Sequence, residues 1–171
     1  MAPGAGVPRL GLATWLAFLV PAGLLAGAWG SQIWGGLQPC EMCWWQRYAH
    51  GVALAFALCA LLARLGAGRP GLVRPLLWVA ALAMLASGGK GAYQAGVEAH
   101  VFKGVTQCTS TATTGTAAER IEQIMNSPLV RCDVVQWQFL GISMAGWNAI
   151  LSIGFALWIL WLSLRRPRLA R

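Results

Sequence analysis

Two cysteine pairs are the residues of this chain whose types and spacing could carry chemistry. Cys40 and Cys43 form a Cys-x-x-Cys pair where a polar loop enters an apolar stretch, and Arg47 follows one helical turn later. A cysteine at a helix start lies near the positive end of the helix dipole, and a nearby guanidinium adds positive charge, so the reactive thiolate is favoured. Cys108 and Cys132 follow later, separated by 23 residues of a polar loop. This pattern indicates electron transfer through disulfides.

Other roles for these cysteines are less favoured. Zinc needs four ligands and neither histidine is near either pair in sequence, so no metal site is expected. Haem attachment would need a histidine directly after Cys43, where Trp44 stands. A structural disulfide between Cys40 and Cys43 would close too short a loop to stabilise much, whereas one between Cys108 and Cys132 would contribute ~3 kcal/mol. A reactive pair on the same side of a membrane favours exchange between the pairs, because thiolates attack disulfides.

The composition is that of a membrane protein. Hydrophobic residues make up 57% of the 171 residues and charged residues 11%, with a mean hydropathy of +0.58. Soluble domains carry about 25% charged residues, which disfavours a water-soluble fold. Four apolar stretches reach the ~20 residues that a helix needs to cross the hydrocarbon core, and the first is too long for a signal peptide. They cover approximately residues 10–30, 44–63, 72–95 and 142–163.

We therefore predict an all-α membrane protein, a single four-helix transmembrane bundle over residues 1–171. Two connections, approximately 31–43 and 96–141, hold the cysteine pairs. In the longer one, Thr116 and Glu119 have the spacing of a capping box and precede an amphipathic run. That pattern predicts a short amphipathic helix lying on the membrane surface.

The basic residues indicate topology. The net charge is +8, and its arginines cluster at 64–74 and at 165–171, while the connections that hold the cysteines are nearly neutral. The positive-inside rule then places both termini and residues 64–74 in the cytoplasm and both cysteine pairs in the periplasm. That compartment permits disulfides. Because the charge marks topology, no binding of nucleic acid is expected.

Three further side chains near the membrane boundary are candidates for binding an electron carrier. Arg47 shares a helix face with Cys43, so it could hold the thiolate charge and donate to a carbonyl of a membrane electron carrier; the alternative is a lipid-headgroup anchor. His50 and His100 could handle protons, and the alternative for both is a polar residue resting at the interface. Cys59, inside the second stretch, is expected to act only as a small hydrophobe.

Small and polar residues inside the apolar stretches suggest how the helices pack. Gly23 and Gly27 form a Gly-x-x-x-Gly pair, and residues 80–95 are rich in small side chains; ordinary close packing of helices is the expectation for both. Lys90 is the only polar residue that we expect deep in a span, where it would line the bundle interior or reach for the surface.

Together these features resemble the bacterial disulfide bond formation protein B family. The block Pro39–Tyr48 is similar to the family's Cys-x-x-Cys followed by Gln-Arg, and the block Cys132–Asn148 is similar to its entry into the fourth span. The likeness also includes the four spans, the order of the loops and the placement of the cysteines. It covers nearly the whole chain.

The resemblance implies a quinone-dependent thiol oxidase of the bacterial inner membrane. Cys108 and Cys132 would take electrons from a soluble periplasmic disulfide oxidase of thioredoxin fold. Cys40 and Cys43 would receive them and pass them to ubiquinone, or to menaquinone when oxygen is absent. In that scheme Cys43 faces the quinone and Arg47 lies beside it.

Two other functions remain as alternatives. A reductase of the vitamin K epoxide type is also a helical bundle with a Cys-x-x-Cys, although its active pair comes late in the chain and here the pair precedes the second span. A small non-enzymatic membrane protein would carry only structural loop disulfides. If such a protein were a transporter, it would be expected to have polar residues deep in several spans.

Overall fold

The computed structural model describes residues 6–66, 69–104, 116–119 and 130–164. Four long helices dominate this part of the chain, and each is long and apolar enough to cross a membrane. They are α1 (Gly6–Ile33), α2 (Glu41–Leu65), α3 (Pro70–Glu98) and α5 (Met144–Leu164). The predicted four-helix membrane fold is therefore confirmed. The helices α1, α2 and α3 each extend beyond the apolar stretch that predicted them, whereas α5 begins two residues inside its predicted stretch and extends one residue past it.

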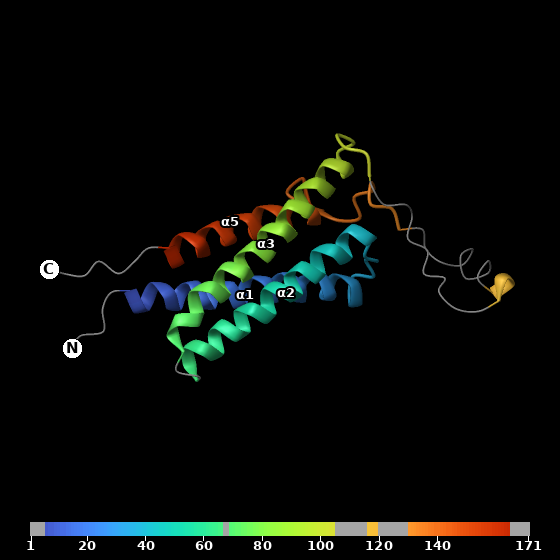
Figure 1. Cartoon of the computed structure of the whole chain (residues 1–171). Coiled ribbons are helices and arrows are strands. Elements are labelled where there is room, and N and C mark those ends of the chain that lie inside the picture. Colours follow the sequence, from blue (N-terminus) through green and yellow to red (C-terminus); the bar gives the residue numbers. More distant parts are fainter. Residues whose placement is uncertain (1–5, 67–68, 105–115, 120–129, 165–171) are drawn as a thin grey trace, which may run out of the picture.

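The four helices form a bundle in which α3 packs between α2 and α5, while α1 packs against α2 and α5 (Figure 1). The start of α1, the end of α5 and the start of α3 lie at one end of the bundle (Figure 1). The start of α2, the end of α3 and the start of α5 lie at the opposite end, which therefore holds the Cys-x-x-Cys pair. We call this the cysteine end.

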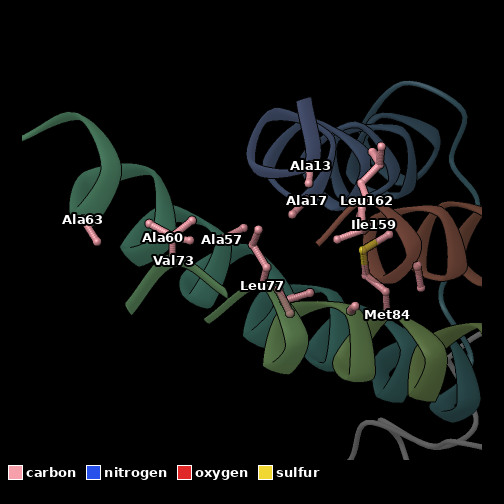
Figure 2. Close-up of a cluster of buried hydrophobic side chains, with 14 residues drawn as sticks. Ala13, Ala17, Ala57, Ala60, Ala63, Val73, Leu77, Met84, Ile159 and Leu162 are labelled. Atoms are coloured by element: carbon pink, nitrogen blue, oxygen red, sulfur yellow. The ribbon is translucent and has the colours of Figure 1, made fainter. Parts of the chain in front are cut away.

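The core of the half away from the cysteine end is built largely of alanine (Figure 2). Its buried members include Ala13, Ala17, Ala53, Ala57, Ala60, Ala80, Ala81 and Ala156. Larger buried side chains such as Leu77, Met84 and Ile159 fill the remaining space. Many of the large apolar side chains instead point outward, as expected where lipid surrounds the helices. Small side chains let transmembrane helices approach closely, which explains the tight packing of this half.

The glycines pack differently from the prediction at one site and as predicted at another. A Cβ added at Gly23 or Gly27 would meet no atom within 4 Å, so the expected close helix contact at this pair is wrong. On α3, a Cβ at Gly88 would lie 2.7 Å from Ile153 Cγ1, and one at Gly91 would lie 2.8 Å from the carbonyl oxygen of Ala145. The small residues of α3 therefore permit its close approach to α5.

A short hairpin leads into α5 and was not predicted. Strands β1 (Gln138–Phe139) and β2 (Ile142–Ser143) pair antiparallel. The turn between them places Leu140 at φ 54° and Gly141 at φ 77°, the left-handed conformation that two-residue hairpin loops require. The Ser143 hydroxyl then accepts a hydrogen bond of 3.1 Å from the Gly146 amide at the first turn of α5.

The predicted capping box is present. The Glu119 carboxylate accepts a hydrogen bond from the Thr116 amide at 2.7 Å, and the Thr116 hydroxyl accepts one from the Glu119 amide at 3.4 Å. Residues 117–119 are helical, whereas the amphipathic run at 121–125 lies outside the described residues.

Two residues inside the spans face outward. Lys90 is exposed on α3, with its ammonium 4.5 Å from the centre of the Trp45 ring, so it reaches the surface and does not line the interior. Cys59 is exposed on α2, where it fits the expected role of a small hydrophobe facing lipid.

Candidate active site

The Cys-x-x-Cys pair occupies the first turn of α2. Cys40 is the N-cap residue, and its sulfur accepts a hydrogen bond of 3.4 Å from the Cys43 amide. The two sulfurs are 2.9 Å apart as thiols. The hydrogen bond with Cys43, followed by burial, raises the pKa of the Cys40 thiol far above its usual value. Cys40 therefore keeps its proton at neutral pH, which leaves Cys43, at the positive end of the helix, as the sulfur suited to carry charge.

Cys132 lies beside Cys40. Both are buried, at 8% and 1% exposure, in one cluster with Met42 and Val97. A hydrogen bond between the two side chains adds to the raised pKa of Cys40. The structure thus brings three of the four predicted cysteines together, and the fourth, Cys108, lies outside the described residues.

Gln94 of α3 contacts the Cys43 sulfur. Its amide nitrogen lies 3.5 Å from that sulfur and donates a hydrogen bond of 3.0 Å to Glu98. Its oxygen accepts a hydrogen bond of 2.7 Å from the side-chain nitrogen of Gln46. Gln46 also donates to the carbonyl oxygen of Met42 at 3.3 Å, and both glutamines are buried. An amide donor fixed against a sulfur stabilises negative charge there.

Gln46 continues the polar chain towards α5. Its oxygen accepts a hydrogen bond of 2.7 Å from the Asn148 amide nitrogen. Asn148 in turn contacts His50 Nε2 through its oxygen at 2.8 Å and donates to the Ser87 carbonyl at 3.3 Å. The Ser152 hydroxyl donates to the same Asn148 oxygen at 2.8 Å. Polar side chains from α2, α3 and α5 therefore form one connected network inside the bundle.

The expectation that Lys90 alone would be polar deep in a span was wrong. A signal of the polar network was present in the sequence, because Gln46, Gln94 and Asn148 interrupt otherwise apolar stretches. Sequence alone does not show that they face one another. Polar groups buried among apolar helices must satisfy one another, and this gives the network its single arrangement.

Arg47 is fixed between α1 and α2. Its Nη1 donates to Gln32 Oε1 at 2.6 Å, and its Nη2 donates to the Ala28 carbonyl oxygen at 2.9 Å. Its Cζ lies 4.9 Å from the ring centre of Trp29 and 5.1 Å from that of Trp44. With 9% of Arg47 exposed, the guanidinium is held by protein, which does not fit a lipid-headgroup anchor.

A cavity of about 570 Å³ opens between the helices at the cysteine end. All four long helices and the segment 131–137 border it. Its polar wall includes Cys40, Cys43, Gln46, Arg47, His50, Gln94 and Asn148. Its apolar wall includes Gly23, Leu24, Gly27, Ala28, Met144 and Trp147. Gly23 and Gly27 thus leave open the side of the cavity that α1 forms.

The two histidines differ in position. His50 is buried, with 3% exposed, and lines the cavity. His100 lies just beyond the end of α3 at φ 57°, is exposed, and is not among the described residues that line the cavity. Among the residues described, no cluster of histidine, cysteine and acidic side chains could hold a metal ion.

Comparison with known proteins agrees with this arrangement. The sequence model of a family described as disulfide bond formation protein DsbB matches residues 10–162, from the first turns of α1 to the end of α5. The chain belongs to this family. DsbB-family membership makes it a multi-pass membrane protein of disulfide bond formation. The resemblance in the two sequence blocks is confirmed, and the vitamin K epoxide reductase-like alternative loses its support.

Individual DsbB-family relatives are similar over most of their length. Disulfide bond formation protein B of Xanthomonas campestris pv. campestris (strain 8004) is 33% identical over 157 residues, covering 85% of this chain and 86% of the relative. Its counterpart in Marinobacter nauticus is 34% identical over 139 residues, covering 79% and 80%. That of Aromatoleum aromaticum is 34% identical over 146 residues, covering 78% and 80%. No solved structure matches the chain significantly.

Proposed function

We propose that this protein is a thiol:quinone oxidoreductase of the bacterial inner membrane. It reoxidises a soluble periplasmic disulfide oxidase of thioredoxin fold and delivers the electrons to ubiquinone or menaquinone. The observation that carries the proposal is the cavity, whose wall includes both Cys43 and Arg47 near the start of α2.

The residues around the cavity fit a quinone. Its volume of about 570 Å³ lies within the range of ~300–1,000 Å³ that is usual for small-molecule pockets. The open side at Gly23 and Gly27 suits a flat apolar ring or its isoprenoid tail. Arg47 has five N–H donors, of which its two described hydrogen bonds use two, so donors remain for a carbonyl oxygen. When bound, a quinone supplies an acceptor for two electrons and two protons.

The cysteine geometry supports a route for the electrons. The partner's dithiol reduces the disulfide of Cys108 and Cys132 by exchange and leaves with a disulfide of its own. The Cys132 thiolate then attacks the Cys40 sulfur of an oxidised Cys40–Cys43 pair, and Cys43 leaves as a thiolate. Gln94 and the start of α2 stabilise that leaving group.

Two further bond changes close the cycle. Cys108 attacks Cys132, which restores the loop disulfide and releases Cys40 and Cys43 as a dithiol. Oxidation of that dithiol to the disulfide gives two electrons and two protons to the quinone. In the sum, the partner dithiol and the quinone become the partner disulfide and the quinol, and the four cysteines return to their starting state.

The proposed orientation follows from charge. Arg69 and Arg74 lie at the end of the bundle opposite the cysteines, so the positive-inside rule places that end in the cytoplasm. Cysteines introduced at Trp34 and at Gly71, both exposed at opposite ends, test this in a chain whose native cysteines are serines. An impermeant thiol reagent added to intact spheroplasts should label the cysteine at 34 and spare that at 71. The reverse pattern would overturn the orientation and the periplasmic partner.

Anaerobic reoxidation tests the reaction itself. The purified, fully reduced protein in lipid nanodiscs is mixed with a short-chain ubiquinone or with menadione, and the loss of quinone absorbance is compared with the loss of free thiols. We expect one quinone reduced for each pair of thiols lost, and no reaction in Cys43→Ser. The proposal would be refuted if the thiols stayed reduced with both quinones.

A further inference from the structure

One ring nitrogen of His50 is buried at the cavity wall without a hydrogen-bond partner. Of the His50 side chain only 3% is exposed, and the described residues offer no partner to Nδ1. A buried polar atom left unpaired destabilises the fold, because it has lost the hydrogen bonds that water would give it. Because His50 also lines the cavity, a bound molecule can supply the missing partner. The unused hydrogen-bonding position of Nδ1 therefore points to a ligand atom.

The network determines which nitrogen of His50 carries the hydrogen. Asn148 donates from its amide nitrogen to the backbone carbonyl oxygen of Ser87 at 3.3 Å, and a carbonyl oxygen can only accept. This sets the Asn148 side chain so that its oxygen faces His50 Nε2 at 2.8 Å. Since that oxygen is also only an acceptor, Nε2 must donate. In the neutral ring, Nδ1 is then a bare acceptor at the cavity.

The same network fixes the position of His50 relative to the cysteines. Gln46 is oriented by its hydrogen bond to the Met42 carbonyl at 3.3 Å, and its oxygen accepts from Asn148 at 2.7 Å. Through Gln94, which hydrogen-bonds Gln46 at 2.7 Å and contacts Cys43, the chain reaches the reacting sulfur. Two backbone carbonyls thus fix an amide chain that spans from the thiol to the imidazole.

We propose that His50 exchanges a proton through Nδ1 with a ring oxygen of the quinone reduced in this cavity. The inference rests on the proposed function and adds a catalytic residue to it. A quinone carbonyl oxygen accepts only, so it pairs with Nδ1 when the imidazole is protonated; a quinol hydroxyl donates, so it pairs with Nδ1 of the neutral ring. His50 is therefore complementary to the oxygen both before and after proton transfer.

The protons and electrons balance. As Cys40 and Cys43 form their disulfide, two electrons pass to the quinone, and protonated His50 gives its Nδ1 proton to one ring oxygen. One of the two protons released by the thiols goes to the other ring oxygen, and the second restores protonated His50. The dithiol and the quinone become the disulfide and the quinol, and His50 is unchanged. General acid–base groups of this kind accelerate reactions by about 10²–10⁴-fold.

Other titratable groups border the same cavity and must be separated from His50 in any pH profile. They are Cys40, Cys43 and Arg47 on α2, Glu98 on α3, and Arg131 in the segment before α5. The described lining residues of α1 and α5 include none. A pH-dependent step that disappears with His50 alone is therefore assigned to its ring.

The variant His50→Gln isolates Nδ1. The glutamine amide nitrogen can take the place of Nε2 and still donate to Asn148, but nothing in the new side chain titrates. Ser163→Ala is the control, because its buried hydroxyl, on the same helix as Asn148, binds Trp78 Nε1, outside the network that holds His50, and does not line the cavity. Both variants are measured in nanodiscs for quinone reduction between pH 5 and 8, for KM, and for oxidation of dithiothreitol in a single turnover without quinone.

We expect His50→Gln to lower kcat for quinone reduction by about 100-fold or more, to flatten the pH profile, and to leave the quinone-free turnover intact. Ser163→Ala should keep both within about threefold of wild type. Should His50→Gln fail to assemble, His50→Ala with added imidazole replaces it, and recovery of the rate is expected. Wild-type kinetics and pH profile in His50→Gln, or no recovery by imidazole, would overturn the role of His50 alone. Absence of quinone reduction in the wild type would instead overturn the proposed function.

Discussion

Arg47 offers a test that separates the charge of a side chain from its geometry. Its planar fork donates to Gln32 at 2.6 Å and to the Ala28 carbonyl at 2.9 Å, and it lies against the Trp29 and Trp44 rings. A lysine keeps the positive charge but lacks the fork that holds these acceptors together. Methionine keeps the apolar volume and loses the charge as well. The two variants therefore remove one property and then both.

The size of the effect follows from these contacts. A hydrogen bond to a charged group is worth about 1.5–3 kcal/mol, which corresponds to roughly 10- to 100-fold in binding. In Arg47→Lys the lysine ammonium is no longer held towards the cavity by Gln32 and Ala28. We therefore expect KM for quinone to rise by roughly 10- to 100-fold. Exchange between Cys132 and Cys40 should stay near the wild-type rate, since a cation still supports the Cys43 thiolate. In Arg47→Met both the quinone step and the exchange should slow.

Stopped-flow quinone reduction and quinone-free single turnover measure the two steps separately. Gln32→Ala is a useful control, because it removes one anchor of the guanidinium without changing its charge, and it should affect KM in the same direction as Arg47→Lys. Equal KM values in wild type and Arg47→Lys would show that charge alone suffices. Wild-type behaviour of Arg47→Met in both steps would refute any part for Arg47 in the reaction.

Two further outcomes are expected. Cys132→Ser should abolish oxidation of the partner while quinone still reoxidises Cys40–Cys43, whereas Cys59→Ala should leave turnover unchanged; partner oxidation at the normal rate in Cys132→Ser would make the loop pair a structural clip. Gly27→Leu should fill the open side of the cavity and raise KM for quinone by at least about tenfold, because the leucine occupies space that the ring or tail needs. Its control is a leucine at exposed residue 89, also with nothing within 4 Å of an added Cβ; an equal effect at both positions would show that the cavity is not the binding site.

The fold was predictable because a membrane span requires a long apolar stretch, and such stretches occur in this chain only where the four helices form. The Cys-x-x-Cys at a helix start was predictable for a similar reason, since polar loop gives way to apolar helix at that point. Hydropathy could not supply the rotation of each helix about its axis. That rotation decides that Gln94 meets Cys43 and that Gly27 faces a cavity and not a neighbouring helix.

The histidines illustrate the same limit. Both stand near the boundary of an apolar stretch, and sequence gave equal grounds for a functional role. Three residues beyond Arg47 on α2, His50 points inward and hydrogen-bonds with Asn148. His100 follows the end of α3 in a left-handed conformation, with its amide donating to the Val97 carbonyl at 3.0 Å. The chain there folds back along α3, where Phe102 stacks on Tyr93, and the His100 side chain is left exposed. The hairpin before α5 escaped prediction because its strands are only two residues long.

The burial of Cys40 has a consequence for the selectivity of the electron supply. With 1% of Cys40 and 8% of Cys132 exposed, a small thiol in the surrounding medium finds little sulfur to attack. Thiol–disulfide exchange needs a straight approach to the sulfur, so electrons from stray reductants are held back at the surface. Small thiols should therefore reduce these cysteines slowly, although a concentrated reagent such as dithiothreitol still drives a single turnover. Under the proposed function, this burial would shield the quinones of the membrane from reduction by thiols that diffuse past.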